Sequence, residues 1–271
     1  RFPSFFEPHW YGDEGIYQVV AKSLQEGRVL YQEIWDNKPP VLYLIYAFFN
    51  ADLFLVKLAS TIVGVGSVLE FFFLAKAFIA REKIVYFSTA LFATLFGLPL
   101  LEGNIANAEN FMLLPLILSS YFILSRKHFI ASGLLLSIAF LTKTIAVFDV
   151  AAFLTFLAFA YTWKRENISK TVRQFSLHIR PIVMGFSLPI LLTLLIFWGS
   201  GIIPDFIKAT FLQGVDYVST GNSFFFPQGL LLIKLLLLGS FVILMYLYRK
   251  TFTKFQIFIL VVLMENLESV I

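Results

Sequence analysis

The chain lacks cysteine and has few histidines, and each shortage removes a class of chemistry. No cysteine occurs among its 271 residues, so it can hold no disulfide, no thiolate metal site and no cysteine nucleophile. Three histidines are present, and His9, which has no further ligand type beside it, is a poor metal candidate. Glycine-rich phosphate loops and the His-Glu-x-x-His, Gly-x-Ser-x-Gly and Asp-x-Asp patterns are also missing from the sequence.

Charged side chains are scarce as well, at 14% of the residues, which excludes an ordinary water-soluble domain. Hydrophobic residues make up 59% of the chain, 33 residues are Phe, and the mean hydropathy is +0.82. The net charge of +4 could suggest a nucleic-acid partner. The charges, however, stand in short clusters between apolar runs, which is typical of membrane proteins. The composition therefore predicts an all-α polytopic membrane protein and no nucleic-acid binding.

Long apolar runs are what the chain has in place of charges. A helix that crosses a bilayer needs about 20 predominantly apolar residues. Eight runs are candidates, namely 53–79, 84–100, 109–125, 128–142, 145–163, 181–200, 229–248 and 255–271. A further run, Val41 to Asn50, would cover only about 15 Å as a helix, about half of the hydrocarbon core. We expect this short run to lie in the membrane interface.

The distribution of Lys and Arg predicts which loops face the cytoplasm. If 41–50 does not cross, the loops on one side carry 13 of the 21 Lys and Arg, with only Glu82 and Glu166 as acids. These loops are 76–83, 126–128, 163–180 and 249–254. By the positive-inside rule they are cytoplasmic. The opposite, exterior side then holds 1–52, 100–108, the 143–144 turn and 201–228.

Two parts follow from this division of the chain. Residues 1–52 form an exterior segment with juxtamembrane helices, and residues 53–271 form a transmembrane bundle of about eight spans. We also expect an internal piece of a longer protein. A preceding span would be needed to bring Arg1 to the exterior, and the run 255–271 stops inside an apolar helix.

Within the exterior segment, local signals predict two helices. Asp13 to Glu26 is amphipathic, with Asp13 as its N-cap and Gly27 as its C-cap. Its apolar face could rest on the membrane surface and consists of Ile16, Val19, Val20 and Leu24. The polar stretch 28–38 leads to Pro39-Pro40, which favours a new helix from Pro40.

A set of motifs in this segment then points to a family. Gly12-Asp13-Glu14-Gly15-Ile16-Tyr17 comes first, followed by Ala21, by Gly27-x-x-Leu30-Tyr31, and by Trp35-Asp36-Asn37-Lys38-Pro39-Pro40. Asn107-Ala108-Glu109 opens a later span, and Leu141-Thr142-Lys143 closes another. In order and spacing, over about residues 5–165, this set resembles the GT-C membrane glycosyltransferases. Within the GT-C enzymes, the motif set resembles the branch of protein O-mannosyltransferase-like and aminoarabinose-transferase-like bacterial enzymes.

The resemblance implies a fold, a reaction and a role for one residue. It implies a GT-C-like helix bundle in a prokaryotic plasma membrane, with its active site on the exterior face. The donor would be a polyprenyl-phosphate sugar, and a lipid, protein or glycan would accept the sugar with inversion. Of the residue roles, the resemblance implies that of Asp13 as the general base.

The other site residues are predicted from their chemistry and their place at the exterior boundary. Glu14 and Glu109 are further candidate catalytic acids. The residues expected to bind the sugar and the lipid phosphate are Tyr17, Arg28, Asp36, Lys38 and Lys143.

No cofactor is expected, and no metal ligand is assigned, although a divalent metal stays open. Relatives specific for aminoarabinose carry Glu directly before the Lys-Pro pair, where this chain has Asn37.

The physical requirements agree with the assigned roles, because a lipid-phosphate sugar already has a good leaving group. The enzyme must deprotonate the acceptor and stabilise the departing phosphate. Lys57 and Lys208 are further cations at the exterior boundary.

Each assignment has a structural alternative. Asp13 could serve only as an N-cap, and Glu14 could only complement the helix dipole. Glu109 could simply begin its span, and Lys143 could extend to the interface. Glu70 and Asp149 lie inside spans and are expected to be hydrogen-bond partners between helices. The alternative function is a polytopic transporter or lipid flippase, and a third is a non-catalytic scaffold.

Overall fold

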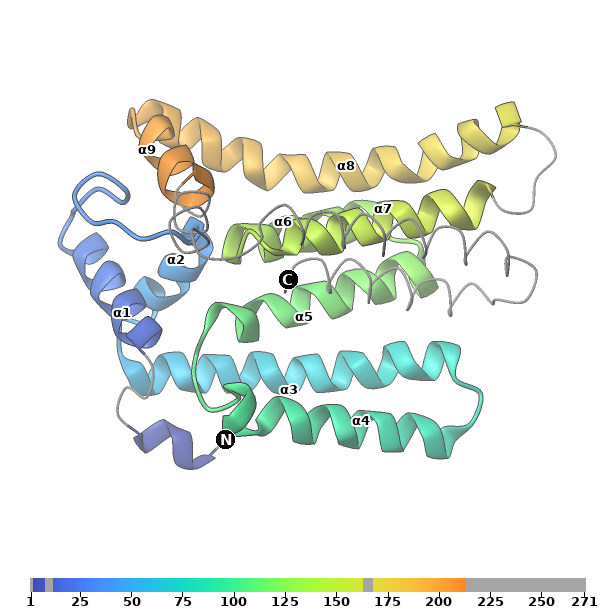
Figure 1. Cartoon of the computed structure of the whole chain (residues 1–271), viewed down its shortest axis with the longest axis horizontal. Helices are drawn as coiled ribbons and strands as arrows, with labels where there is room; N and C mark the ends of the chain where they lie inside the picture. Colours follow the sequence, from blue (N-terminus) through green and yellow to red (C-terminus); the bar gives the residue numbers. More distant parts are fainter. Residues whose placement is uncertain (1, 8–11, 163–167, 213–271) are drawn as a thin grey trace, which may run out of the picture. The chain divides into compact units, whose positions relative to one another are not determined.

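The computed structural model describes residues 2–7, 12–162 and 168–212, and these residues are helical with no β-strand among them (Figure 1). The chain divides into two compact units. The first consists of residues 1–144 and 182–213, and the second of 145–181 and 214–271. The predicted spans 229–248 and 255–271 lie outside the described residues. The site described below belongs to the first unit.

Residues 1–52, which are predicted to be exterior, fold into short helices, of which the local signals predict the second and third. They are the 3₁₀-helix η1 (Phe2–Phe6), α1 (Gly12–Gln25) and α2 (Pro40–Phe48). Gly27 follows α1 with φ +85°, the left-handed conformation of a helix C-cap. Pro40 is the first residue of α2, after Pro39 in an extended conformation. The two local stop and start signals are therefore confirmed.

Two details of the α1 prediction are wrong. The helix begins at Gly12, so Asp13 lies in its first turn and is not the N-cap. The predicted apolar face is also split, because Val20 is buried in the protein core while Ile16 and Val19 are exposed. A helix that packs on the protein on one side and meets lipid or solvent on the other needs apolar residues on both faces.

The longer helices come next along the chain. They are α3 (Leu53–Phe78), α4 (Glu82–Gly97), α5 (Ala108–Tyr121), α6 (Phe129–Thr142), α7 (Ala146–Thr162) and α8 (Ile168–Gly199). The 3₁₀-helix η2 (Pro99–Leu101) follows α4, and the π-helix η3 (Phe122–Arg126) continues α5. The short α9 (Ile203–Ile207) and the π-helix η4 (Lys208–Leu212) follow α8.

Three of these helices are long and apolar enough to cross a membrane: Leu53–Phe78, Ala108–Arg126 and Phe175–Gly199. The described residues are thus helical, with three candidate membrane-spanning helices, as is consistent with a membrane protein. The predicted spans 84–100, 128–142 and 145–163 also form helices, but α4, α6 and α7 have 16, 14 and 17 residues. At 1.5 Å per residue they cover about 21–26 Å, somewhat less than the roughly 30 Å core. The count of eight spans stays a prediction.

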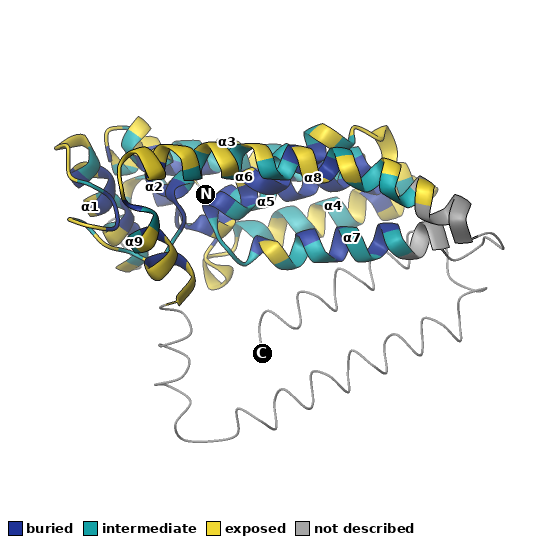
Figure 2. Ribbon diagram, turned by 90° about the horizontal axis from the view of Figure 1, so that it is seen from above, coloured by how far each residue is buried: buried dark blue, intermediate teal, exposed yellow. Residues whose placement is uncertain are grey.

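Inside the first unit the long helices pack side by side. α3 contacts both α4 and α5, and α5 contacts α6 (Figure 1). Half of the spanning part of α5 is buried, against 22% of α3 and 17% of α8 (Figure 2). α5 is therefore an inner helix, and α3 and α8 present apolar side chains to the surroundings, as lipid-facing helices do.

The N-terminal segment, residues 1–52, packs onto the ends of these long helices. Its aromatic residues Tyr17, Tyr31, Tyr43 and Tyr46 form one buried core with residues from the starts of α3 and α5, the end of α8, and α9. The Tyr46 hydroxyl donates to the carbonyl of Ala106, 2.7 Å away, just before α5. This packing holds the polar motifs of α1 and of residues 35–38 at one end of the helix bundle.

Candidate functional site

Asp13 and Lys38 form an ion pair beside Tyr17. The Tyr17 hydroxyl donates to Asp13 Oδ2 at 2.9 Å, one helical turn away on α1. Lys38 Nζ lies 4.0 Å from the same Oδ2 and 5.6 Å from the centre of the Tyr17 ring. The Asp13 side chain is 37% exposed, so its carboxylate can meet a molecule from outside the protein. Asp13 is thus held by two partners and stays accessible.

The turn before α2 sets the position of Lys38. Tyr43 donates its hydroxyl proton to Asp36 Oδ2 at 2.6 Å and accepts the backbone N–H of Lys38 at 3.2 Å. The Tyr31 hydroxyl donates to the Lys38 carbonyl at 2.9 Å. Lys38 Nζ in turn donates to Asn37 Oδ1 at 2.9 Å. Two buried tyrosines therefore clamp the backbone of Lys38, and Asn37 helps to orient its ammonium group.

Glu109 and Lys143 form a second acid–lysine pair at the same end of the bundle. Glu109 lies in the first turn of α5, Lys143 directly follows α6, and Lys143 Nζ donates to Glu109 Oε1. The Glu109 side chain is 48% exposed and that of Lys143 is 25% exposed. The helix α2, which begins two residues after Lys38, packs against α6.

The two pairs share one electrostatic environment around Tyr17. Burial raises the pKa of the Tyr17 hydroxyl far above its usual range, and the negative charges of Asp13, Glu109 and Asp36 raise it further. Burial, followed by the charge of Asp36, raises the pKa of Tyr43 in the same direction. Both hydroxyls therefore keep their protons and act as fixed donors to carboxylates. We call Asp13, Asp36, Lys38, Glu109 and Lys143 the charged cluster.

Glu14 occupies a different environment from Asp13. Its side chain is fully buried, Oε1 accepts the backbone N–H of Ala106 at 2.7 Å, and Oε2 lies 3.7 Å from Lys57 Nζ. Lys57 is 2% exposed and also donates to the Glu7 carbonyl. The pair ties α1 to α3 and to the turn before α5. Glu14 and Lys57 are therefore positioning residues in the structure. A direct contact of Glu14 with substrate stays a prediction.

Two other cations are not brought into the charged cluster. Arg28 is exposed, and its Nε lies 4.0 Å from Glu26. Lys208 is exposed on η4, beside α9. Asp205 on α9 accepts a hydrogen bond from Gln32 at 2.8 Å, which links this part of the 201–228 segment to residues 28–38. The rest of that segment, from residue 213, lies outside the described residues.

The sequence analysis missed the tyrosines of α2 and the polar turn before α5. Tyr43 and Tyr46 stand three residues apart in a short apolar helix, and that spacing is a signal for one buried face. In the turn, Asn107 Nδ2 donates to Glu102, and Asn107 Oδ1 caps α5 by accepting from the N–H of Asn110. The capping pattern of Asn107 before a helix was readable from the sequence.

Within the described ranges, no group of three or more His, Asp or Glu side chains is placed to hold a metal ion. The acids of the charged cluster are instead paired with lysines or tyrosines. In the described part of the chain, the arrangement can accept a proton at Asp13 and offer positive charge at Lys38 and Lys143.

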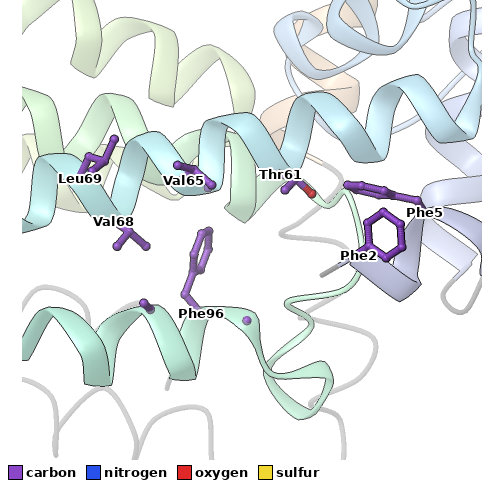
Figure 3. A pocket seen from close by; sticks show the side chains of 10 residues that line it. Phe2, Phe5, Thr61, Val65, Val68, Leu69 and Phe96 are labelled. Carbon is purple, nitrogen blue, oxygen red and sulfur yellow. The ribbon is translucent and has the colours of Figure 1, made fainter.

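An apolar groove of about 520 Å³ lies between α3, α4 and η1 (Figure 3). Its walls come from Val65, Val68 and Leu69 on α3, from Phe96 on α4, and from Phe2 and Phe5 of η1. Its η1 end adjoins the buried pair, because Lys57 Nζ bonds to the carbonyl of Glu7, one residue after η1. A groove of this shape and lining suits a hydrocarbon chain.

Comparison with known proteins gives no relative: no family model, no curated protein and no solved structure matches the chain.

Proposed function

We propose that this protein is a membrane glycosyltransferase of the GT-C type, which moves a sugar from a polyprenyl-phosphate donor to an acceptor on the exterior face. The observation that carries the proposal is the charged cluster, where an accessible carboxylate lies beside lysines at one end of a membrane-spanning bundle. All five residues of the cluster belong to motifs that resemble those of the GT-C enzymes.

In the proposed reaction Asp13 is the general base. The acceptor hydroxyl or amine attacks the anomeric carbon of the sugar and gives its proton to Asp13. The bond between the anomeric carbon and the phosphate oxygen breaks on the opposite side, so the configuration inverts. The electron pair leaves with the lipid phosphate, whose charge Lys38 and Lys143 balance. Tyr17 holds the Asp13 carboxylate in place through its hydroxyl proton.

The two lysines need not be free before the donor binds. Lys38 lies at 4.0 Å from Asp13, beyond a short hydrogen bond, and Lys143 is paired with an exposed Glu109. Ammonium groups form charge-assisted hydrogen bonds with phosphate as they do with carboxylate, so a bound donor can replace the acid as the partner of either lysine. Phosphate binding at either lysine would also release an acid, so Glu109 would become available to orient the acceptor.

The apolar groove supports a lipid-linked donor. It lies on α3 and α4 and reaches η1. Glu7, the residue after η1, accepts a hydrogen bond from Lys57, which is the ion-pair partner of Glu14. The absence of an Asp-x-Asp pair, which enzymes using nucleotide sugars employ to hold a metal, agrees with a lipid donor.

The test incubates the protein in membranes with radiolabelled polyprenyl-phosphate sugars and follows both the donor and the product. Donor loss with label appearing in an acceptor supports the transferase. The rival function, a transporter or flippase, predicts instead that the labelled lipid stays intact and changes its leaflet. That result would contradict the proposal, and so would the absence of both events with every donor.

A further inference from the structure

A second recess lies at the far end of the α3–α4 hairpin from the charged cluster. It has a volume of about 170 Å³ and is walled by Phe72 and Lys76 of α3, by Ile79 and Ala80 of the turn, and by Glu82, Val85 and Tyr86 of α4. The helix α3 carries Lys57 at one end and Lys76 at the other, roughly 28 Å apart along the axis. This separation matches the roughly 30 Å hydrocarbon core, so the recess lies at the other membrane boundary.

The recess is lined by one cation, Lys76, and one acid, Glu82, and two further cations, Arg81 and Lys83, flank Glu82 in the sequence. Lys76, Arg81 and Lys83 are exposed within eight residues of chain, and Glu82 is the one acid among them. None of the ion pairs found among the described residues includes these three cations. Lys76 Nζ lies 5.9 Å from the centre of the Phe72 ring, so an aromatic face holds the ammonium group at the recess.

The exposed apolar side chains near the recess favour a lipid over a soluble anion as its ligand. Phe73, Ile84 and Phe87 are exposed large apolar side chains and are sequence neighbours of the residues Phe72, Val85 and Tyr86 that line the recess. A soluble phosphate would use the cations and leave these apolar groups in contact with water. A phospholipid places its phosphate at the cations and its acyl chains on the apolar side chains, so both parts of the surface are used.

We infer that the recess at the α3–α4 turn binds the phosphate of an anionic phospholipid, with Lys76 as the main contact and Arg81 and Lys83 as supporting charges. This inference does not depend on the proposed glycosyltransferase function. It concerns the side of the membrane opposite the charged cluster, which the Lys and Arg distribution predicts to be cytoplasmic.

The test purifies the protein in neutral detergent and titrates it with phosphatidylglycerol or phosphatidylcholine, with bound lipid counted by native mass spectrometry. We expect tighter binding of phosphatidylglycerol, and we expect Lys76→Gln to weaken it about fivefold. The matched control is Lys127→Gln, an exposed lysine on the same side that does not line the recess. Glu82→Gln should strengthen binding, since it removes the one negative charge.

Three results would overturn the inference. Equal losses with Lys76→Gln and Lys127→Gln would mean that any cation on this side attracts the lipid. Equal binding of phosphatidylcholine would mean that the charge is not recognised. Equal binding of glycerophosphoglycerol, which has the same phosphodiester without acyl chains, would show that the recess takes a soluble anion. Lys76 is exposed at the end of α3, so its replacement should leave the fold intact.

Discussion

At the scale of single residues, neighbouring acids in the same motif have opposite environments. Asp13 is accessible and held by Tyr17 and Lys38, whereas Glu14 is fully buried against Lys57. Successive residues of a helix point about 100° apart, so the two carboxylates turn to different sides of α1. One acid is thereby available for chemistry, and the other anchors the helix that carries it.

The buried pair gives the first prediction. Lys57→Met should destabilise the protein by about 3–5 kcal/mol, because it leaves the buried Glu14 carboxylate without its cation. The double variant Lys57→Met with Glu14→Gln removes both charges and should recover most of that loss. Thermal unfolding in detergent measures both. A double variant as unstable as the single one would show that the pair is not coupled.

The buried tyrosines give a prediction on pH. Burial raises the pKa values of Tyr17, Tyr31, Tyr43 and Tyr46 above 10, the value for the unfolded chain. The folded state then holds these protons more tightly than the unfolded state, so their contribution to stability is complete below pH 10 and falls above it. The unfolding temperature should therefore drop between about pH 10 and 11.5. Tyr43→Phe should show a smaller drop over that interval, and an unchanged drop would argue against this cause.

At the scale of elements, α6 and α8 approach so closely that only glycine fits between them. A Cβ at Gly133 would lie 2.1 Å from the Ile182 carbonyl oxygen, and a Cβ at Gly185 would lie 2.2 Å from that of Ile130. Backbone cannot yield as a flexible side chain can. Gly133 on α6 and Gly185 on α8 each face the backbone of the other helix and therefore allow the two helices to cross at this short distance.

Gly185→Ala should accordingly separate the two helices and cost about 1–3 kcal/mol or more of stability. The matched control is Gly199→Ala at the end of the same helix, where an added Cβ meets nothing within 4 Å. Heat inactivation of the two variants side by side measures the difference. If both behaved like the wild type, the close crossing would be in error.

Local elements could be predicted from the sequence, and pairings between them could not. Gly27 and Pro40 mark a helix end and a helix start through their own backbone preferences, which need no tertiary partner. The pairs Asp13–Lys38 and Glu109–Lys143 join residues from separate elements, so only the motif resemblance brought them together. The burial of Glu14 against Lys57 had no local signal at all, because it depends on how α1 docks on α3.

At the scale of the whole molecule, we expect the charged cluster and the α3–α4 recess to lie on opposite sides of a membrane. The absence of cysteine makes this directly testable. A cysteine introduced at exposed Lys22 on α1 should react with a membrane-impermeant maleimide in intact cells. A cysteine at Lys127 should react only after the cells are permeabilised. Labelling of both positions in intact cells would contradict the predicted topology.

The central claim is that Asp13 is the base of a sugar transfer, and the most direct measurement compares Asp13→Asn with Glu26→Gln. Both variants neutralise an acid in the exterior segment, but Glu26 has only the exposed Arg28 as an ion-pair partner. Transfer from a labelled polyprenyl-phosphate sugar should fall by about 10²–10⁴-fold in Asp13→Asn, with donor binding retained, and should persist in Glu26→Gln. Equal transfer by Asp13→Asn and the wild type would contradict the account.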